Sequence, residues 1–276
     1  MCGLFGIIRS DIITGTGADW LAAAIAAELE IAMSERGTDS WGYVTAGRGY
    51  ESIARGIGSI VPGNGNRRTP LAPIVLGHTR HSTHGASTIR NAHPFERGDV
   101  ALMHNGIIYN APTHCTVDSE ILAERASDRA PIDDLEGYGT VQWIEGGEAY
   151  ICRMSGGDLD LAWVSSVQRQ ARILIWSSDL VQSEKVIKAI QPDASFRHHP
   201  TLPAGRVYRI DQPTLTLRRE SYEMNLCHAR NRKKWYEYGT GASLGYDWLD
   251  AYQKPTTPTV ELVPAPITGP WRLGDE

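Results

Sequence analysis

The feature that most restricts the fold is a succession of short apolar segments, separated by Gly, Pro, Asp and Asn. Segments of this length with turn residues at both ends are typical of β-strands. So many short strands predict at least two sheets. The candidate strands are residues 2–9, 41–47, 73–83, 100–110, 140–145, 148–154, 159–164, 171–177 and 205–210.

Three segments have helical spacing instead, and each has a candidate cap at its amino end. The longest is residues 19–37, where apolar residues recur every three to four positions behind Asp19. Two shorter helices are expected from about Ser119 and behind Ser177 or Ser178. A few helices among many strands predict helical layers outside the sheets.

The composition is that of a globular protein, because hydrophobic residues make up 41% and charged residues 21% of the 276 residues. No apolar run approaches the roughly 18 residues that cross a bilayer, and the amino end lacks the basic start of a signal peptide. We therefore expect a cytoplasmic protein that does not contact a membrane. A net charge of −5 gives no general reason to bind nucleic acid, although residues 228–234 are locally basic.

The four cysteines, at positions 2, 115, 152 and 227, are far apart and form no CxxC pair. Neither a zinc site nor a disulfide framework is expected from such spacing. Cys2 is the unusual one, because it directly follows Met1. If Met1 is removed, Cys2 carries both a thiol and a free α-amino group.

The chemistry of such a residue follows from its two groups. The amine, with an ordinary pKa of about 7.7–8.0, can take up the proton of a thiol with a pKa of about 8.5 near neutral pH. One residue can then supply both nucleophile and base. The alternative is that Cys2 is a small apolar residue that opens a buried strand.

Five stretches bear on this choice. They are CGLFGII at 2–8, RGTDSWG at 36–42, GHTRHSTHGASTIRNAHPF at 77–95, MHNGIIYN at 103–110 and DSE at 118–120. In this order they resemble the class II glutamine amidotransferases, a family of N-terminal-nucleophile hydrolases. In that family the N-terminal cysteine attacks the side-chain amide of glutamine and releases ammonia. GTVQWIE at 139–145 and LPAGRVYRI at 202–210 also fit, so the resemblance covers residues 2–210.

The resemblance implies an α+β fold, a four-layer αββα sandwich with a short C-terminal extension. We expect the amidotransferase domain at residues 2–212. Residues 213–255, rich in Tyr, Trp and Arg, form the expected aromatic and basic extension, and the Pro- and Thr-rich residues 256–276 form an extended tail. The implied substrate is L-glutamine, and no metal or cofactor is expected.

The same resemblance implies the catalytic groups. Cys2 is the expected nucleophile. The side-chain amide of Asn105 and the backbone N–H of Gly106 are the expected oxyanion donors, because an attacked amide needs fixed donors in a dry site. Asn-Gly is also a strong hairpin signal, but apolar residues on both sides favour a strand here.

Charged groups are implied for the other end of glutamine. Arg80 can hold the α-carboxylate with two parallel N–H bonds, and Asp118 can pair with the α-ammonium group. Thr83 and His84 are expected to line the same pocket. His81 departs from the aromatic or aliphatic residue that is usual after the arginine. Three further residues, Arg36, Asp39 and His93, are expected to support the site without touching substrate.

One stretch points to a different chemistry and is set aside. SGGDLD at 155–160 resembles the loop of ATP pyrophosphatases, but it lies between two predicted strands. The sequence therefore predicts a hairpin turn at Gly156 and Gly157, and no ATP site.

The ammonia needs an acceptor. Family members are usually fused to, or paired with, a synthase that consumes it, and only about 65 residues follow position 210, which is short for such a domain. We therefore expect a separate synthase subunit. Residues 228–250 are the candidate docking surface, or else a terminal helix packed on its own domain.

Three alternatives stay open at this point. The chain could be a free-standing γ-glutamyl amide hydrolase, or an inactive scaffold of the same fold. It could also be another N-terminal-nucleophile amidase, such as an acylase, which would not need the pair of Arg80 and Asp118.

Overall fold

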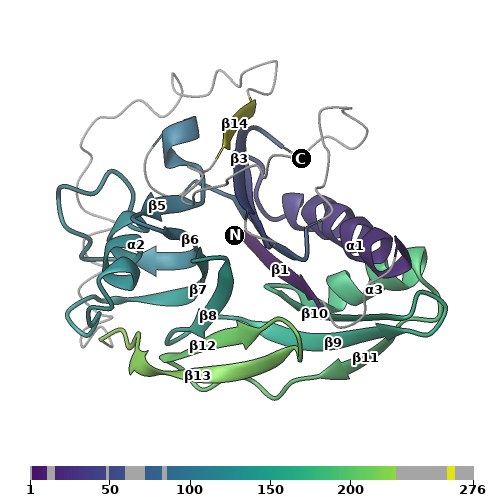
Figure 1. Ribbon diagram of the computed structural model, residues 1–276. Coiled ribbons are helices and arrows are strands. Elements are labelled where there is room, and N and C mark those ends of the chain that lie inside the picture. Colours follow the sequence, from purple (N-terminus) through teal and green to yellow (C-terminus); the bar gives the residue numbers. More distant parts are fainter. Residues whose placement is uncertain are drawn as a thin grey trace, which may run out of the picture.

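The computed structural model consists of two antiparallel β-sheets packed face to face, with helices on their outer faces (Figure 1). It describes residues 2–10, 16–47, 50–59, 72–82, 86–227 and 260–264. The eight-stranded sheet has the order β11 (Ser195–His198), β9 (Asp160–Ser166), β10 (Ala171–Ser177), β1 (Gly3–Arg9), β4 (Ile74–Arg80), β2 (Ser40–Gly47), β3 (Tyr50–Ile57) and β14 (Val260–Pro264). The six-stranded sheet has the order β13 (Thr216–Glu223), β12 (Arg206–Asp211), β8 (Glu148–Arg153), β7 (Gly137–Glu145), β6 (Val100–Ile108) and β5 (Phe95–Arg97).

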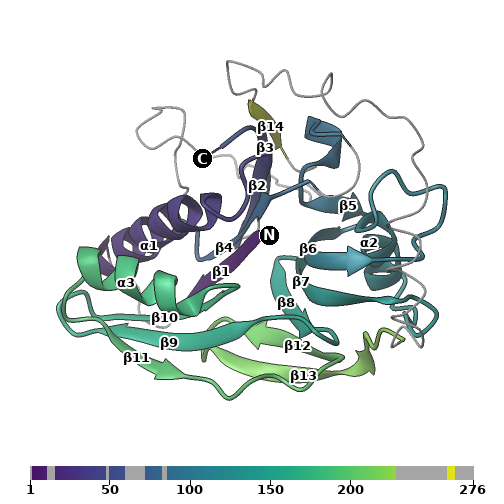
Figure 2. The same cartoon turned by 180° about the vertical axis from the view of Figure 1, so that it is seen from behind.

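The helices complete four layers. α1 (Thr16–Ser34) and α3 (Leu180–Ile190) cover the eight-stranded sheet, while α2 (Glu120–Ser127) covers the six-stranded sheet. Figure 2 shows the same separation of the helices from behind. A single turn of 3₁₀ helix, Ile89–Asn91, precedes β5. This arrangement confirms the αββα fold expected from the sequence.

Alternation of side chains along the strands builds three apolar layers. In β1, Phe5 and Ile7 pack toward α1 and α3, whereas Leu4 and Ile8 pack between the two sheets. In β6, Met103 faces the inter-sheet layer, and its neighbours on the strand face α2. Because the eight-stranded sheet is covered on both faces, its strands β1 and β4 are buried throughout, whereas β7 and β8 of the six-stranded sheet are buried except at their ends.

The helix caps differ from the predictions. α1 begins at Thr16, so Asp19 is not its cap; the Asp19 carboxylate lies in the first turn and pairs with the buried guanidinium of Arg9 at 2.7 Å. α3 is capped by Asp179, whose carboxylate accepts a hydrogen bond from the backbone N–H of Gln182 at 3.0 Å. The prediction of a serine cap for α3 was therefore wrong.

The predicted hairpin at 155–160 was also wrong. β8 belongs to the six-stranded sheet and β9 to the eight-stranded sheet, so this stretch carries the chain from one sheet to the other. A Cβ atom on Gly157 would lie 1.9 Å from the carbonyl oxygen of Gly139, and Gly156 has a φ of +71°. The glycines are needed for close approach to β7 rather than for a two-residue turn.

Several strands carried no clear sequence signal. β13 is a half-exposed edge strand with charged side chains, which extends the six-stranded sheet past the expected domain boundary at residue 212. β14 lies within the segment expected to be a tail and pairs with β3 from Val260 to Pro264. The rest of the expected extension, residues 228–255, lies outside the described residues, as do residues 256–259 and 265–276 of the expected tail.

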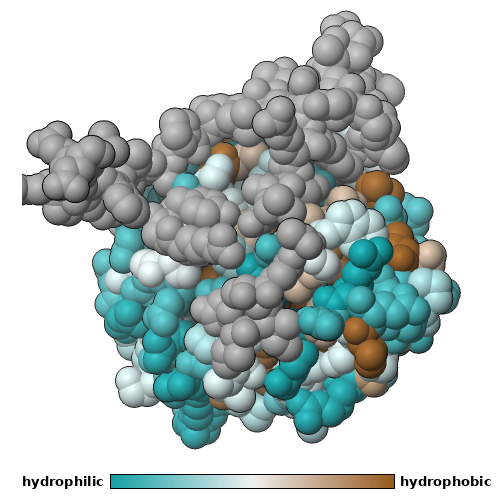
Figure 3. All heavy atoms as spheres, turned by 45° about the vertical axis from the view of Figure 1, so that its right-hand side comes forward, coloured by the Kyte–Doolittle hydropathy of each residue, from teal (hydrophilic) through white to brown (hydrophobic). Residues whose placement is uncertain are grey.

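Large hydrophobic side chains are exposed at a few described positions, which are Trp20, Tyr109, Tyr138, Val167 and Val181. In the view of Figure 3, hydrophobic residues form separate patches on a largely hydrophilic surface. Trp20 on α1 is 46% exposed and is covered by the guanidinium of Arg169, at 4.4 Å from the ring centre. None of the described helices is both long and apolar enough to cross a bilayer.

One polar side chain joins the two sheets inside the apolar layer between them. Gln142 on β7 is fully buried, and its amide nitrogen donates to the carbonyl oxygens of Phe5 at 3.0 Å and Gly77 at 3.1 Å. Its amide oxygen accepts a hydrogen bond from Nε1 of Trp176 at 2.6 Å. Strands β1, β4 and β10 are thus tied to β7.

Replacing Gln142 should therefore destabilise the fold. Gln142→Leu conserves volume but leaves the Trp176 indole N–H and two carbonyl groups without their partner, so we expect a loss of about 2–4 kcal/mol in the free energy of unfolding. Urea denaturation measures it. Gln182→Leu on α3 is the control, expected to change stability by less than about 0.5 kcal/mol. Equal stability of the two variants would contradict a structural role for Gln142.

Candidate active site

Cys2 directly precedes β1, at the end where Gly3 pairs with Thr79 of β4. Two backbone groups of His81 contact the sulfur of Cys2. The His81 N–H donates to Sγ at 3.4 Å, and the thiol reaches the His81 carbonyl oxygen at 3.6 Å. Burial raises the pKa of the Cys2 thiol, while the His81 N–H and the charge of Arg80 act in the opposite direction. The Cys2 sulfur thus has a hydrogen-bond donor and a cation close by.

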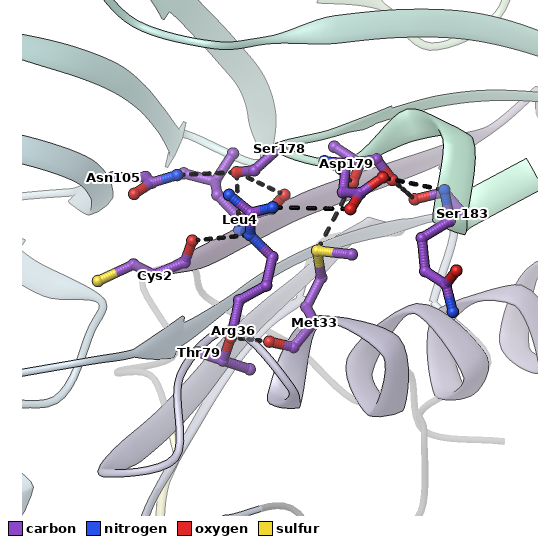
Figure 4. Close-up of polar contacts among 11 residues, drawn as sticks. Cys2, Leu4, Met33, Arg36, Thr79, Asn105, Ser178, Asp179 and Ser183 are labelled. Atoms are coloured by element: carbon purple, nitrogen blue, oxygen red, sulfur yellow. Dashed lines mark hydrogen bonds and ion pairs between the residues drawn. The ribbon is translucent and has the colours of Figure 1, made fainter.

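Arg36 links the backbone of Cys2 to the start of α3. Its Nε donates to the carbonyl oxygen of Cys2 at 3.3 Å, and its Nη1 lies 3.6 Å from the Asp179 carboxylate (Figure 4). Asp179 is the residue that caps α3. The backbone beside the thiol is therefore held by an ion pair at the start of a helix.

Asp39 fixes the backbone around His81, next to the Cys2 sulfur. Its backbone N–H donates to the carbonyl oxygen of Arg80 at 3.0 Å, and its carboxylate accepts the backbone N–H of Ser82 at 2.7 Å. The half-exposed imidazole of His81 lies 3.8 Å from the same carboxylate. Asp39 is thus hydrogen-bonded to the residues before and after His81, whose N–H contacts Cys2.

A cation and an anion lie within electrostatic range of Cys2. Arg80 ends β4 and is 4% exposed, and its Nη1 donates to the carbonyl oxygen of Ala86 at 3.5 Å. Burial lowers the pKa of its guanidinium, an effect that the negative charges of the Cys2 thiolate and Asp118 oppose. The Asp118 carboxylate accepts the backbone N–H of Ile108 at 2.8 Å. Such a pair suits the two charges of an amino acid.

Asn105 and Gly106 are neighbours on β6. The Asn105 side-chain nitrogen donates to Oγ of Ser178 at 2.8 Å. A Cβ atom on Gly106 would lie 2.0 Å from the carbonyl oxygen of Tyr138 and 2.5 Å from Nε2 of His104, so a larger residue does not fit there. This position therefore requires glycine, because the backbone of β7 and the ring of His104 leave no space for a side chain.

Three buried histidines lie behind these groups. His93, a predicted supporting residue, lies against His78 with ring centres 3.8 Å apart and the ring planes tilted by 40°, and it contacts Phe95 edge to face. His104 on β6 has its Nδ1 3.1 Å from Oγ of Ser119. Burial lowers the pKa of all three, that of His78 to about 3. Among the described residues, no group of three or more His, Cys, Asp or Glu side chains is arranged to hold a metal ion.

The structure thus brings together most of the predicted site residues. Thr83 and His84 lie outside the described residues. Sequence reasoning did not assign Ser178, Asp179 and His104 to the site. Ser178 and Asp179 are more than 70 positions from Asn105 and give no local signal, so only the pairing of β10 with β1 reveals them. The predicted residues that gather around Cys2 and its neighbours are Arg36, Asp39, Arg80, His93, Asn105, Gly106 and Asp118.

No family model matches the chain. It is 37% identical over 112 residues to glutamine–fructose-6-phosphate aminotransferase of Bartonella quintana and 39% identical over 115 residues to that of Zymomonas mobilis. These matches cover 40% and 41% of this chain but only 17% and 18% of the relatives, so the similarity concerns a small part of their length.

A solved structure agrees with the fold. Glutamine phosphoribosylpyrophosphate amidotransferase from B. subtilis aligns with a TM-score of 0.51 and 16% identity, over 82% of this chain and 51% of that chain. At this identity the alignment concerns the fold alone. Together with the sequence relatives, it confirms the resemblance of the chain to class II glutamine amidotransferases.

The buried histidines predict a loss of stability in acid. The pKa of His78 is about 3 in the folded protein and about 6.5 in the unfolded chain, so its contribution is complete above pH 6.5 and disappears as the pH falls toward 3. His78→Gln removes this titration. We expect the free energy of unfolding to fall between pH 7 and pH 5 by about 2 kcal/mol less in the variant than in the wild type. Urea melts at both pH values measure the difference, and parallel decreases would contradict it.

Proposed function

We propose that the chain hydrolyses the side-chain amide of L-glutamine to glutamate and ammonia through a thioester on Cys2. The observation that carries this proposal is the position of the Cys2 sulfur, next to the His81 N–H and within range of the charges of Arg80 and Asp118. The proposed oxyanion donors, Asn105 and Gly106, lie on β6 of the six-stranded sheet. Glutamine is part of the names of the relatives in Bartonella quintana and Zymomonas mobilis, which supports the same substrate.

The proposed steps use these groups in order. Arg80 binds the α-carboxylate of glutamine and Asp118 its α-ammonium group, which places the side-chain amide at Cys2. The sulfur attacks the amide carbon, and the Asn105 side chain and Gly106 N–H stabilise the negative charge on its oxygen. The carbon–nitrogen bond breaks, ammonia leaves with the proton taken from the thiol, and water then hydrolyses the thioester. Removal of Met1 frees the α-amine that carries this proton.

The remaining sequence-based assignments belong to the same proposal. Thr83 and His84 complete the pocket, and Arg36, Asp39 and His93 support it. The amidotransferase domain is proposed to include residues 2–212 at least, and the protein to act in the cytoplasm. The relatives do not favour a γ-glutamyl amide hydrolase or an inactive scaffold.

Steady-state kinetics test the chemistry on protein whose intact mass shows that Met1 is removed. Cys2→Ala should lose all turnover of glutamine, whereas Arg80→Lys should mainly raise KM, because a lysine cannot form the two parallel bonds to a carboxylate. Asp118→Asn should also raise KM. Cys115→Ala is the matched control and should keep wild-type activity.

Two outcomes would contradict the proposal. Full activity of Cys2→Ala would exclude this nucleophile. Equal turnover of glutamine and a simple acyl amide by the wild type would favour an acylase-like amidase, which needs no pair of charges for an amino acid.

We further propose that a separate synthase subunit consumes the ammonia. Ammonia released into water near pH 7 is mostly protonated and no longer a nucleophile, so delivery within a complex preserves its reactivity. Glutaminase activity should then be low in the isolated chain and rise when the synthase docks. Affinity purification from the native source, followed by glutaminase assays with and without the co-purified protein, measures this. Full activity of the chain alone would favour a free-standing hydrolase.

A further inference from the structure

Ser178 stands at the junction between β10 and α3 and is bonded on two sides. Its backbone N–H donates to the carbonyl oxygen of Leu4 at 2.9 Å. Its Oγ accepts the Leu4 N–H at 3.1 Å and lies 3.4 Å from the Leu4 carbonyl oxygen. On the other side, Oγ accepts the side-chain N–H of Asn105 at 2.8 Å (Figure 4). Ser178 therefore joins the strand that follows Cys2 to the side chain of Asn105.

The direction of these bonds decides which end of the Asn105 amide faces Ser178. A serine hydroxyl has one hydrogen and two acceptor lone pairs. The hydrogen is directed to the carbonyl oxygen of Leu4, so Oγ offers a lone pair to Asn105. A lone pair attracts the amide nitrogen and repels the amide oxygen. The last side-chain torsion of asparagine has no sharp preference of its own, so this contact sets it.

We propose that Ser178 is a positioning residue for Asn105. It uses one hydrogen of the Asn105 nitrogen and thereby directs the second toward the oxygen of the attacked amide. This inference rests on the proposed function of Asn105 as an oxyanion donor. An oxyanion donor is effective when it is oriented before the reaction, since it then costs no reorganisation in the transition state.

Two observations support this role over a purely local one. α3 already has a cap, because the Asp179 carboxylate accepts the Gln182 N–H, so the Ser178 hydroxyl is not needed for the helix. Asp179 also pairs with Arg36, which donates to the carbonyl oxygen of Cys2. At the junction between β10 and α3, Ser178 therefore contacts Asn105, and the adjacent Asp179 is linked through Arg36 to the backbone of Cys2.

A double-mutant cycle tests the proposal. Ser178→Ala should lower kcat for glutamine by about tenfold, the effect of one hydrogen bond of ordinary strength, with KM changed by less than about twofold. In an Asn105→Ala background the same substitution should have no further effect on kcat. Ser178→Thr keeps the hydroxyl and should restore most of the activity.

Ser166→Ala is the matched control. Ser166 ends β9 in the same sheet, and its hydroxyl donates to the Asp193 carboxylate and accepts the backbone N–H of Arg169, away from Cys2. Its loss should leave kcat unchanged. If Ser178→Ala lowers kcat equally with and without the Asn105 side chain, Ser178 acts through the fold and the proposal is wrong. An unchanged kcat in Ser178→Ala would also overturn it.

A second measurement separates this proposal from the proposed function. In protein labelled with ¹⁵N-asparagine, the two side-chain hydrogens of Asn105, assigned by Asn105→Ala, should have distinct NMR shifts in the wild type. In Ser178→Ala they should move toward the values of a free amide. This result would support positioning even if the wild type failed to hydrolyse glutamine, whereas unchanged resonances would overturn it.

Discussion

The position of β1 is the constraint on which the rest of the structure depends. This strand begins right after Cys2, yet it lies in the middle of the eight-stranded sheet and is hydrogen-bonded to β4 on one side and β10 on the other. A chain end is normally frayed. Here the backbone next to Cys2 is fixed by two neighbouring strands and by Arg36, so the sulfur occupies a defined place among its partners.

Several polar side chains near this strand are deeply buried, so the loss of one hydrogen-bond partner there is costly. Gln142 satisfies carbonyl groups of β1 and β4 from the opposite sheet, and the buried histidines lie behind Arg80. In such surroundings charges are weakly screened. The same burial that raises the pKa of the Cys2 thiol therefore also strengthens the effect of the His81 N–H and of Arg80 upon it.

Each end of β1 also has a distinct function in the fold. At the far end the buried guanidinium of Arg9 pairs with Asp19 in the first turn of α1, which docks the helix onto the sheet. At the near end Leu4 bonds to Ser178, and through it to Asn105 on the other sheet. The strand thus connects the outer helical layer, the sheet and the candidate site.

The sequence by itself determined the features carried by local pattern: most strands, the three helices and the stretches that hold Cys2, Arg80, Asn105 and Asp118. Apolar alternation and glycine need only neighbouring residues to be recognised. The tertiary structure alone decided that residues 154–159 cross between sheets, that β13 and β14 add edge strands, and that Asp179 caps α3. It alone also brought Ser178 to Asn105, because a hydrogen bond between residues 73 positions apart depends on how strands pair and sheets stack, which no local pattern records.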